Sequence, residues 1–357
     1  MATQAVSFRH PGTLNSEQEL DFVKARILLG AQPWRDEYEQ LRGSAQASRL
    51  PHGLTHIDSS NDDAITSRDD AIASYGQALL WRFSDDDVFA ERAIAILNAW
   101  SNLQSFTAGS EQDRLQAGWI GAVFAPAAEI LRGYPGWAKA DVSMFQAMFR
   151  RAFYPQVCTA SFWNGNVDLT QIDAMMAIAV FNEDYALFTE AIARWRRRVR
   201  AYFYLASDGT VPHIAGDGDD VLAFWNHPTR WIDGLTQETC RDNGHHTQYA
   251  LGSAIHAAEV AWHQGVDLYT AETRRFTAAL ELLATQLITG DMQGTCSDCA
   301  STGDLYDTWE VAYNHYHNRA GVDLPQTRNL IASLIRPRAP RAVWNLVYET
   351  LTHAGFG

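Results

Sequence analysis

Apolar residues recur at three- and four-residue spacing along almost the whole chain, and this period predicts amphipathic helices. Strand-like alternation is nearly absent, and residues 210–213 are the best candidate for a short strand. Short polar or Gly/Pro segments such as 84–87 and 133–136 separate the helical segments. Successive helices are therefore expected to pack as antiparallel hairpins. The expected helices cover residues 71–83, 88–100, 117–131, 142–153, 172–181, 185–204, 249–263, 270–287, 309–319 and 340–352.

The helical segments share no exact sequence period, which favours an irregular all-α toroid over a regular solenoid. No linker with the character of a domain boundary interrupts the chain, so residues 1–357 are predicted to form a single catalytic domain. Two longer interruptions, 208–237 and 291–308, are expected to be lids or rims of a functional site.

The chain is acidic, with a net charge of −14, and this argues against nonspecific binding to nucleic acid, which needs a basic surface. A polyanionic substrate is still compatible with the charge if basic groups gather in a cleft. The sequence contains no run of about 18 apolar residues, so no membrane span is predicted. Residues 1–11 lack the apolar core of a signal peptide. We expect a secreted or periplasmic protein whose signal is not included in this sequence, with a cytoplasmic protein as the alternative.

The cysteines are Cys158, Cys240, Cys296 and Cys299. Cys296 and Cys299 have the spacing of a redox or metal pair, but a zinc site needs a second pair, and the other two cysteines are isolated. A local disulfide between Cys296 and Cys299, or two free thiols, is predicted instead, with Cys240 as a packing thiol. The sequence predicts no metal and no other cofactor.

The segment 238–249 gathers an unusual set of chemical groups, with Arg241, His245, His246, Gln248 and Tyr249 at the start of a helical pattern. A cation, imidazoles and a phenol at one helix entrance can neutralise a carboxylate and move a proton. The same groups could instead cap and pack the helix.

A second set is Trp163, Asn164 and Asn166, which precede the helical pattern of residues 169–181. Asn164, Asn166 or Asp168 could cap that helix. Alternatively, an amide here donates hydrogen bonds to a substrate carboxylate, and Trp163 forms a wall on which a sugar ring stacks. Gln116 and Trp119 are weaker candidates of the same kind, and Trp231 lies in the first long interruption.

The third set occupies residues 309–319, where Tyr313 and Tyr316 alternate with polar residues that include His315 and Arg319. An aromatic stripe at helical spacing is usually part of a core. A dry core would not accept the polar residues without partners, so a helix that lines a wet cleft is the preferred interpretation.

Together these segments resemble the alginate-lyase superfamily, polysaccharide lyase families five and thirty-eight. The similarity extends over about residues 7–340, and its most specific part is the Arg-Asp-x-Gly-His core that begins at Arg241. Asn164-Gly-Asn166 stands where family five has Asn-Asn-His, which makes the match closer to family thirty-eight. Its other segments are His10-Pro-Gly12, Leu115-Gln-Ala-Gly-Trp119, Ala127-Ala-Glu-Ile-Leu131, Trp163-Asn-Gly-Asn166 and Tyr313-Asn-His-Tyr316.

The resemblance implies an (α/α) toroid, a lyase activity and an acidic polysaccharide substrate, a β-1,4-linked uronan such as polymannuronate or glucuronan. In such a reaction, neutralising the uronate carboxylate stabilises the intermediate as charge develops. That role is assigned to Asn166, with Asn164, His245 or Arg241 assisting.

The group that takes the C5 proton and protonates the departing O4 is expected to be a tyrosine. The candidates are Tyr249, Tyr313 and Tyr316. The resemblance favours the Tyr313/Tyr316 helix, with Tyr249 as the rival and His246 as an alternative base. Gln248, His315 and Arg319 join the tryptophans and Gln116 as candidate substrate contacts.

Two other classes of function stay open at the level of sequence. A glycoside hydrolase on the same toroid needs two carboxylates about 5–10 Å apart. A non-enzymatic scaffold that binds sugars would explain the helices and aromatic residues, but not the clustering around Arg241. The possible carboxylates of a hydrolase are Asp168, Asp173, Asp217, Asp219, Glu238, Asp242 and Glu310.

Overall fold

The structure is a computed structural model that describes residues 7–161, 163–212, 220–297 and 300–355. Its longer helices are α1 (Glu17–Leu28), α2 (Trp34–Gly43), α3 (Asp63–Ser84), α4 (Asp87–Trp100), α5 (Glu111–Leu131), α6 (Lys139–Met148), α8 (Gly165–Asn182), α9 (Tyr185–Tyr202), α11 (His245–His263) and α12 (Thr273–Thr289). The shorter ones are α7 (Tyr154–Val157), α10 (Val221–Phe224), α13 (Glu310–Tyr313), α14 (Pro325–Leu330), α15 (Arg336–Arg338) and α16 (Glu349–His353).

Strands are confined, in the described residues, to two short pairs. A parallel pair joins β1 (His56–Ile57) to β2 (Ser105–Phe106), and an antiparallel pair joins β3 (Ala342–Val343) to β4 (Leu346–Val347). Three helices are extended by π-helical segments at Phe149–Phe153, Asn314–Arg319 and Ile331–Ile335. Short 3₁₀ helices occupy Ala45–Ser48, Ala206–Asp208 and Thr270–Glu272.

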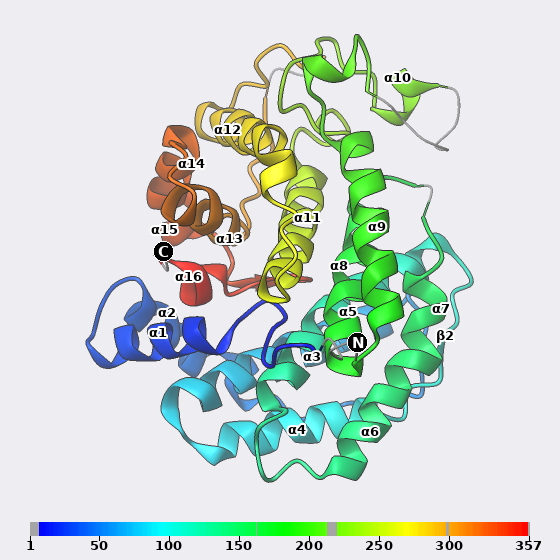
Figure 1. Cartoon of the computed structure of the whole chain (residues 1–357), viewed down its shortest axis with the longest axis vertical. Helices are drawn as coiled ribbons and strands as arrows, with labels where there is room; N and C mark the ends of the chain where they lie inside the picture. Colours follow the sequence, from blue (N-terminus) through cyan, green and yellow to red (C-terminus); the bar gives the residue numbers. More distant parts are fainter. Residues whose placement is uncertain (1–6, 162, 213–219, 298–299, 356–357) are drawn as a thin grey trace, which may run out of the picture.

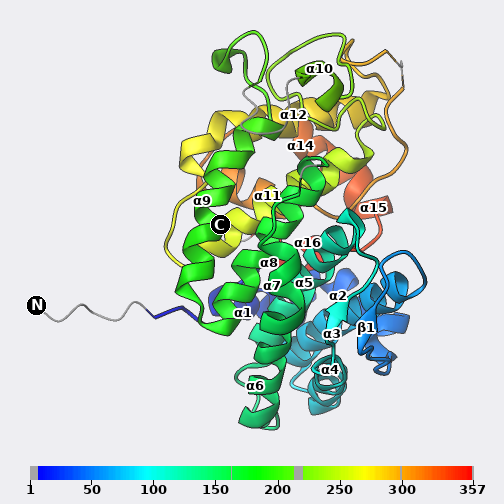
Figure 2. The ribbon, with the colours of Figure 1, turned by 90° about the vertical axis from the view of Figure 1, so that its right-hand side faces the viewer.

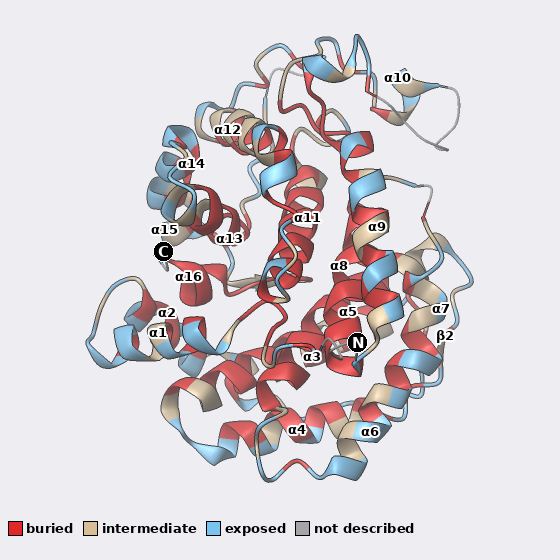
Figure 3. Cartoon of the chain, viewed as in Figure 1, coloured by how far each residue is buried: buried red, intermediate tan, exposed pale blue. Residues whose placement is uncertain are grey.

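The helices form a closed ring. α3 packs on α5, α5 on α8, α8 on α11, and α11 on α13; α16 then joins α13 to α2, which packs back on α3. α4, α6, α9, α12 and α14 lie outside this inner ring (Figure 1). Figure 3 shows α3, α5, α8 and α11 buried on nearly all sides and the outer helices exposed on one face. The predicted all-α toroid is confirmed.

The sequence explains which helices are inside. Every residue of α8 is buried, and its apolar side chains surround the axis instead of forming one stripe. α5 approaches α8 closely at Gly118, where a Cβ atom would lie 2.6 Å from a methyl group of Thr170 and 3.0 Å from its backbone carbon. α9 is buried only along the face that carries Leu187, Trp195 and Val199.

The helices α3, α5, α8 and α11 point in the same direction, so their N-terminal ends share one end of the ring. At that end, the Gln116 Nε2 of α5 donates to the Ala64 carbonyl of α3 at 2.9 Å. The opposite end is crossed by the N-terminal segment, where His10 lies 2.8 Å from Glu129 of α5 and His263 of α11 lies 2.6 Å from the Thr13 carbonyl. Two hollows of ≈ 420 and ≈ 510 Å³ flank His10 at that opposite end.

The segment predicted as a helix over residues 340–352 is instead the β3–β4 hairpin followed by α16. Trp344 and Tyr348 adopt left-handed backbone angles, with φ of 51° and 53°, and each interrupts a right-handed helix. Residues 210–212 form no strand, and His213 lies outside the described residues. α1 and α2 are additional helices that the apolar spacing did not reveal.

No helix in the described parts of the chain is both long and apolar enough to span a bilayer. α10 and the segment around it stand at one extreme of the molecule, far from α4 and α6 in both views (Figures 1 and 2).

Candidate active site

Two of the predicted sets meet where α8 and α11 begin. Asn166 lies in the first turn of α8, and His245, His246 and Tyr249 lie in the first two turns of α11. One turn further along, the hydroxyls of Thr170 and Ser253 are 2.9 Å apart. Because these residues follow Asn166 and Tyr249 by four positions each, Asn166 and Tyr249 occupy the same level on adjacent helices.

Glu238 connects the backbone of Asn166 to the guanidinium of Arg241. Its buried carboxylate accepts from the Asn166 backbone N–H at 2.7 Å and from Arg241 Nη1 at 2.8 Å. Burial raises the pKa of Glu238, although the positive charges of His246 and Arg241 oppose the shift. Glu238 thus fixes the start of α8 relative to Arg241, whose side chain is 39% exposed and reaches the surface of the site.

His246 is oriented by Asp242. Its Nδ1 forms a hydrogen bond with one carboxylate oxygen, and its backbone N–H donates to the other at 3.0 Å. Burial alone would raise the pKa of Asp242, but these hydrogen bonds outweigh burial and hold the pKa below its ordinary value. With Nδ1 engaged, Nε2 is the ring nitrogen of His246 that faces away from Asp242.

Tyr249 is buried in an aromatic cluster with Trp119 and Tyr306, whose ring centroids lie 5.8 and 4.9 Å from its own. Trp119 stacks in turn on Trp344 of the β3–β4 turn at 4.3 Å, and the Arg68 guanidinium lies 5.0 Å above Trp344. Burial raises the pKa of Tyr249, and Tyr306 and Asp304 raise it further, while Arg68 lowers it.

Trp163, Asn164 and Asn166, at the start of α8, have distinct roles. Asn164 caps the helix, since its side-chain oxygen accepts from the Val167 N–H at 3.0 Å. Asn166 is 1% exposed, and its side-chain oxygen has no hydrogen-bond partner among the described residues. A buried acceptor without a partner is costly, so a ligand hydroxyl that donates to the Asn166 oxygen would satisfy it. Trp163 is 50% exposed and offers a ring face to solvent.

The predicted residues on the 309–319 segment lie elsewhere. The Tyr316 ring packs 5.4 Å from Tyr269, whose hydroxyl donates to Glu259 near the far end of α11. Glu259 follows Tyr249 by ten residues, which is about 15 Å along a helix axis. The structure therefore does not bring Tyr313 or Tyr316 together with Asn166 and His246.

His315 and Arg319 of this segment also lie at that far end. His315 stacks on Tyr269 at 3.5 Å, and Arg319 pairs with both Glu19 and Glu259. Glu19, Glu259 and His353 have metal-like spacing, but the Arg319 cation already pairs with both carboxylates.

Three further candidates have structural contacts. Gln116 joins α5 to α3 through Ala64 and Ser67. Gln248 holds the 291–308 loop, since its Nε2 donates to the Asp304 carbonyl at 3.0 Å and its Oε1 accepts from the Tyr306 N–H at 3.3 Å. Trp231 packs on Tyr204 and Trp225, in a cluster separate from that of Tyr249.

The carboxylates considered for a hydrolase are mostly paired inside the protein. Asp168 binds Arg194 and Arg198, Asp173 lies against His256, and Glu310 binds Arg336. Glu238 and Asp242 orient their neighbours, as described above. Asp217 and Asp219 lie outside the described residues.

Sequence reasoning missed Tyr306 and Asp304, which face His245 from the 291–308 loop. The Tyr306 hydroxyl lies 2.9 Å from His245 Nδ1, and Asp304 Oδ2 lies 2.7 Å from the same nitrogen. The available signal was the length of this loop, which predicted a rim without indicating which side chains point inward.

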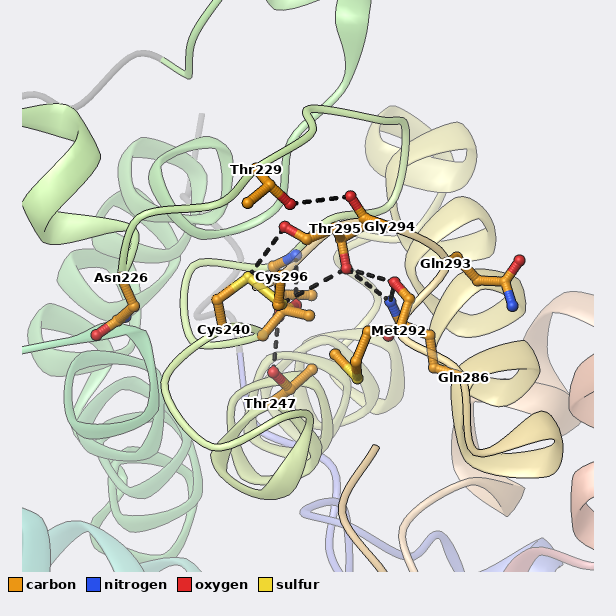
Figure 4. The surroundings of a disulfide bond; sticks show 12 residues. Asn226, Thr229, Cys240, Thr247, Gln286, Met292, Gln293, Gly294, Thr295 and Cys296 are labelled. Carbon is orange, nitrogen blue, oxygen red and sulfur yellow. Dashed lines mark hydrogen bonds between the residues drawn. A yellow bond between two sulfur atoms is a disulfide. The ribbon is translucent and has the colours of Figure 1, made fainter. Parts of the chain in front are cut away.

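The cysteine pairing differs from the prediction. Cys240 forms a disulfide with Cys296, with a Cα–Cα distance of 5.3 Å (Figure 4); Cys296 is therefore not paired with Cys299, which lies outside the described residues. The bond ties the turn that carries Arg241 to the 291–308 loop, and Gln286 of α12 supports that loop through Met292 and Thr295. Spacing along the chain favours near neighbours, whereas the fold brings together two loops separated by 56 residues.

The Cys240→Ser variant is expected to lose about 2–4 kcal/mol of stability, because the crosslink restricts the unfolded chain. Thermal unfolding under non-reducing conditions measures the loss. Cys158→Ser is the matched control, since Cys158 is a free, exposed thiol. Equal melting temperatures for the two variants would contradict the pairing.

A closed helical ring, with amide, guanidinium, imidazole and phenol groups gathered at one end, defines an (α/α)-toroid enzyme of the polysaccharide-lyase class. The alginate lyase family model matches residues 32–292. This is more than half of the chain, so the chain belongs to the alginate lyase family and is a polysaccharide lyase. The predicted family and enzyme class are confirmed.

Solved structures agree on the fold. Alginate lyase A1-III from Sphingomonas species A1 is similar at a TM-score of 0.69 and 16% identity, with 99% of this chain and 98% of that chain covered. A variant of A1-III complexed with a tetrasaccharide has a TM-score of 0.68 at the same identity and coverage. An alginate lyase from Bacteroides ovatus has a TM-score of 0.64 at 15% identity, covering 97% of this chain and 99% of that chain. No curated protein sequence matches the chain.

Proposed function

We propose that this lyase cleaves β-1,4-linked uronans by β-elimination, with polymannuronate-type alginate or glucuronan as substrate. The observation that carries the proposal is the meeting of Asn166, Arg241, His246 and Tyr249 where α8 and α11 begin. Family membership supports the reaction class, and the oligosaccharide bound to the A1-III variant supports a glycan substrate.

The first task is to neutralise the uronate carboxylate. The groups suited to it are the NH₂ group of the Asn166 side chain, which can donate to a carboxylate, the Arg241 guanidinium and the outward ring nitrogen of His246. The N-terminal ends of α3, α5, α8 and α11 lie on the same side of the ring and add positive helix-dipole potential. This local field gives an acidic protein, with a net charge of −14, a place for a polyanion.

The second task is to move a proton. In mannuronate and glucuronate the C5 hydrogen and O4 lie on the same ring face, so one group can serve both atoms. Of Tyr249, Tyr313 and Tyr316, Tyr249 lies at the level of Asn166 and is our candidate for both roles, with His246 as the alternative base. A phenolate that takes the C5 proton becomes the phenol that protonates the departing O4.

Trp163 and Trp119 are proposed to guide the sugar chain. Trp163 is half exposed beside the Asn164 cap, and its ring face suits stacking against a pyranose. Trp119 and the Trp344 stacked on it form the wall next to Tyr249.

Tyr313→Phe and Tyr316→Phe are expected to keep lyase activity within about twofold of wild type, because their rings lie at the far end of α11 or outside the site. Initial rates on polymannuronate measure the effect. Loss of most activity in either variant, with unchanged circular dichroism, would return the proton carrier to the 309–319 segment.

An absorbance assay over alginate, polymannuronate, polyguluronate and glucuronan tests the function. The expected result is an unsaturated product from polymannuronate or glucuronan, and a much slower reaction with polyguluronate, whose C5 hydrogen lies on the other face. A saturated reducing end would indicate hydrolysis, and binding without turnover would indicate a scaffold. Either result would overturn the proposal.

We also propose that the protein works outside the cytoplasm. The Cys240–Cys296 disulfide supports this location, since disulfides persist mainly in oxidising compartments. Fractionation of producing cells, with the disulfide quantified by thiol labelling, tests it; a reduced protein recovered only from the cytoplasm would contradict it.

A further inference from the structure

The first backbone N–H groups of α8 donate to side chains that lie 72 residues further along the chain. The Gly165 N–H donates to Gln237 Oε1 at 2.9 Å, and the Asn166 N–H donates to Glu238 Oε2 at 2.7 Å. The next N–H is bonded by the helix cap described above. The start of a helix usually offers such groups to an anion. Here all three are occupied within the protein, so a substrate carboxylate at this end of α8 must be bound by side chains.

The two oxygens of the Glu238 side chain bond to two different groups of the site. Oε2 accepts from the Asn166 N–H, and Oε1 accepts from Arg241 Nη1 at 2.8 Å. The side chain of Glu238 is 0% exposed, whereas that of Arg241 is 39% exposed. Two accepting oxygens are the pattern of an ionised carboxylate. Charge-assisted hydrogen bonds of this kind are stronger than neutral ones, so they restrict where the two donors can lie.

The turn that carries Glu238 is fixed on both sides. The Thr236 hydroxyl lies 2.8 Å from the hydroxyl of Thr247, which belongs to the first turn of α11. The Gln237 N–H donates at 2.8 Å to the carbonyl of Tyr202, the last residue of α9. The disulfide described above anchors the far side of the same turn. Glu238 therefore bonds to its two partners from a firmly held backbone.

We propose that Glu238 is a positioning residue that aligns Asn166 and Arg241 so that both act on one substrate carboxylate. The proposal rests on the proposed β-elimination and on the part of these two groups in it. Asn166 belongs to α8, and Arg241 belongs to the turn before α11. Among the described residues, Glu238 is the one whose side chain bonds to both. It is buried, so it acts through these two groups and not on the sugar directly.

A competing carboxylate makes this alignment necessary. Asp242 Oδ2 lies 3.8 Å from Arg241 Nε, and the same oxygen is bonded to His246 Nδ1. Without the charge of Glu238, the guanidinium would move toward Asp242 and away from the substrate. A misplacement of about 1 Å can cost about 100-fold in rate, so the position of Arg241 matters as much as its charge.

A double-mutant cycle tests the link between Glu238 and Arg241. Glu238→Gln keeps an oxygen that accepts from the Asn166 N–H but loses the charge that holds the guanidinium. We expect this variant to lower kcat/KM on polymannuronate by about 10–100-fold in the wild-type background. In the Arg241→Ala background the same change should cost about threefold or less. A residue that only supports the fold would cause the same loss in both backgrounds, and that result would overturn the proposal.

Two matched variants separate positioning from helix capping. Gln237→Ala removes the neighbouring acceptor, which bonds the Gly165 N–H. It should lower the melting temperature, and its effect on kcat/KM should be equal with and without Arg241. Glu238→Ala removes both hydrogen bonds, so it should lose more activity than Glu238→Gln and keep part of that loss in the Arg241→Ala background. A Glu238→Ala variant with the wild-type rate per folded molecule would overturn the proposal.

A measurement without substrate separates this proposal from the proposed function. In protein labelled with ¹⁵N at asparagine, the backbone resonance of Asn166 is assigned by its absence in Asn166→Ala. No carbonyl within a helix accepts from an N–H of its first turn, so hydrogen exchange at Asn166 should be at least about tenfold faster in Glu238→Ala than in wild type. An equal exchange rate would overturn the proposal. A wild-type enzyme inactive on every uronan, with the expected exchange, would reject the proposed function and leave the positioning of Asn166 by Glu238 standing.

Discussion

Tyr249→Phe is expected to lower kcat on polymannuronate by about 10³–10⁴-fold, since one hydroxyl serves as both base and acid. The substituted ring keeps its packing against Trp119 and Tyr306, so the melting temperature should change little. Initial rates from the ultraviolet absorbance of the unsaturated product measure the effect. Because burial raises the pKa of Tyr249, and the base form is populated only above the pKa, wild-type activity should increase as pH rises from neutral.

The matched comparison is His246→Ala, which removes the alternative base but retains the phenol. If Tyr249 carries the proton, this variant should keep more activity than Tyr249→Phe and lose mainly affinity for the substrate carboxylate. The opposite ranking, with Tyr249→Phe near wild-type rate, would transfer the role of base to His246.

Most of the fold follows from local sequence pattern. The three-to-four residue spacing correctly located the helices that became α3, α4, α5, α8, α9, α11 and α12. The hairpin at Trp344 was missed because its apolar residues also fit a helical period, and only the left-handed turn that the tertiary structure imposes distinguishes the two.

The site was predictable only in part, for a geometric reason. Asn166 and the 241–249 segment lie at the starts of α8 and α11, and these parallel inner helices bring their N-terminal ends together. Tyr313 and Tyr316 belong to a helix whose position along the ring axis depends on its packing against Tyr269, which the sequence does not encode locally. Of the polar residues that indicated a wet cleft, Arg319 is instead paired with Glu19 and Glu259, whereas His315 Nδ1 and Asn314 Nδ2 have no hydrogen-bond partner among the described residues.

Asn166→Ala is expected to lower kcat by about 10²–10³-fold, the usual cost of removing one hydrogen-bond donor that acts on charge developing in a transition state. The Asn166 side chain is buried with an unsatisfied oxygen, so its removal relieves a cost in the free protein and should leave stability nearly unchanged. Steady-state rates on polymannuronate and thermal unfolding together measure this separation of activity from stability.

Two further variants make the Asn166 prediction specific. Asn166→Asp keeps the shape but adds a negative charge opposite the substrate carboxylate, so it should be at least as inactive as Asn166→Ala, most severely at alkaline pH. Asn164→Ala should instead cost about 1 kcal/mol of stability, because Asn164 caps α8. If Asn166→Ala lowered the melting temperature as Asn164→Ala does and retained its rate per folded molecule, Asn166 would be part of the helix start and not of the chemistry. The carboxylate would then have to be neutralised by Arg241 and His246 alone.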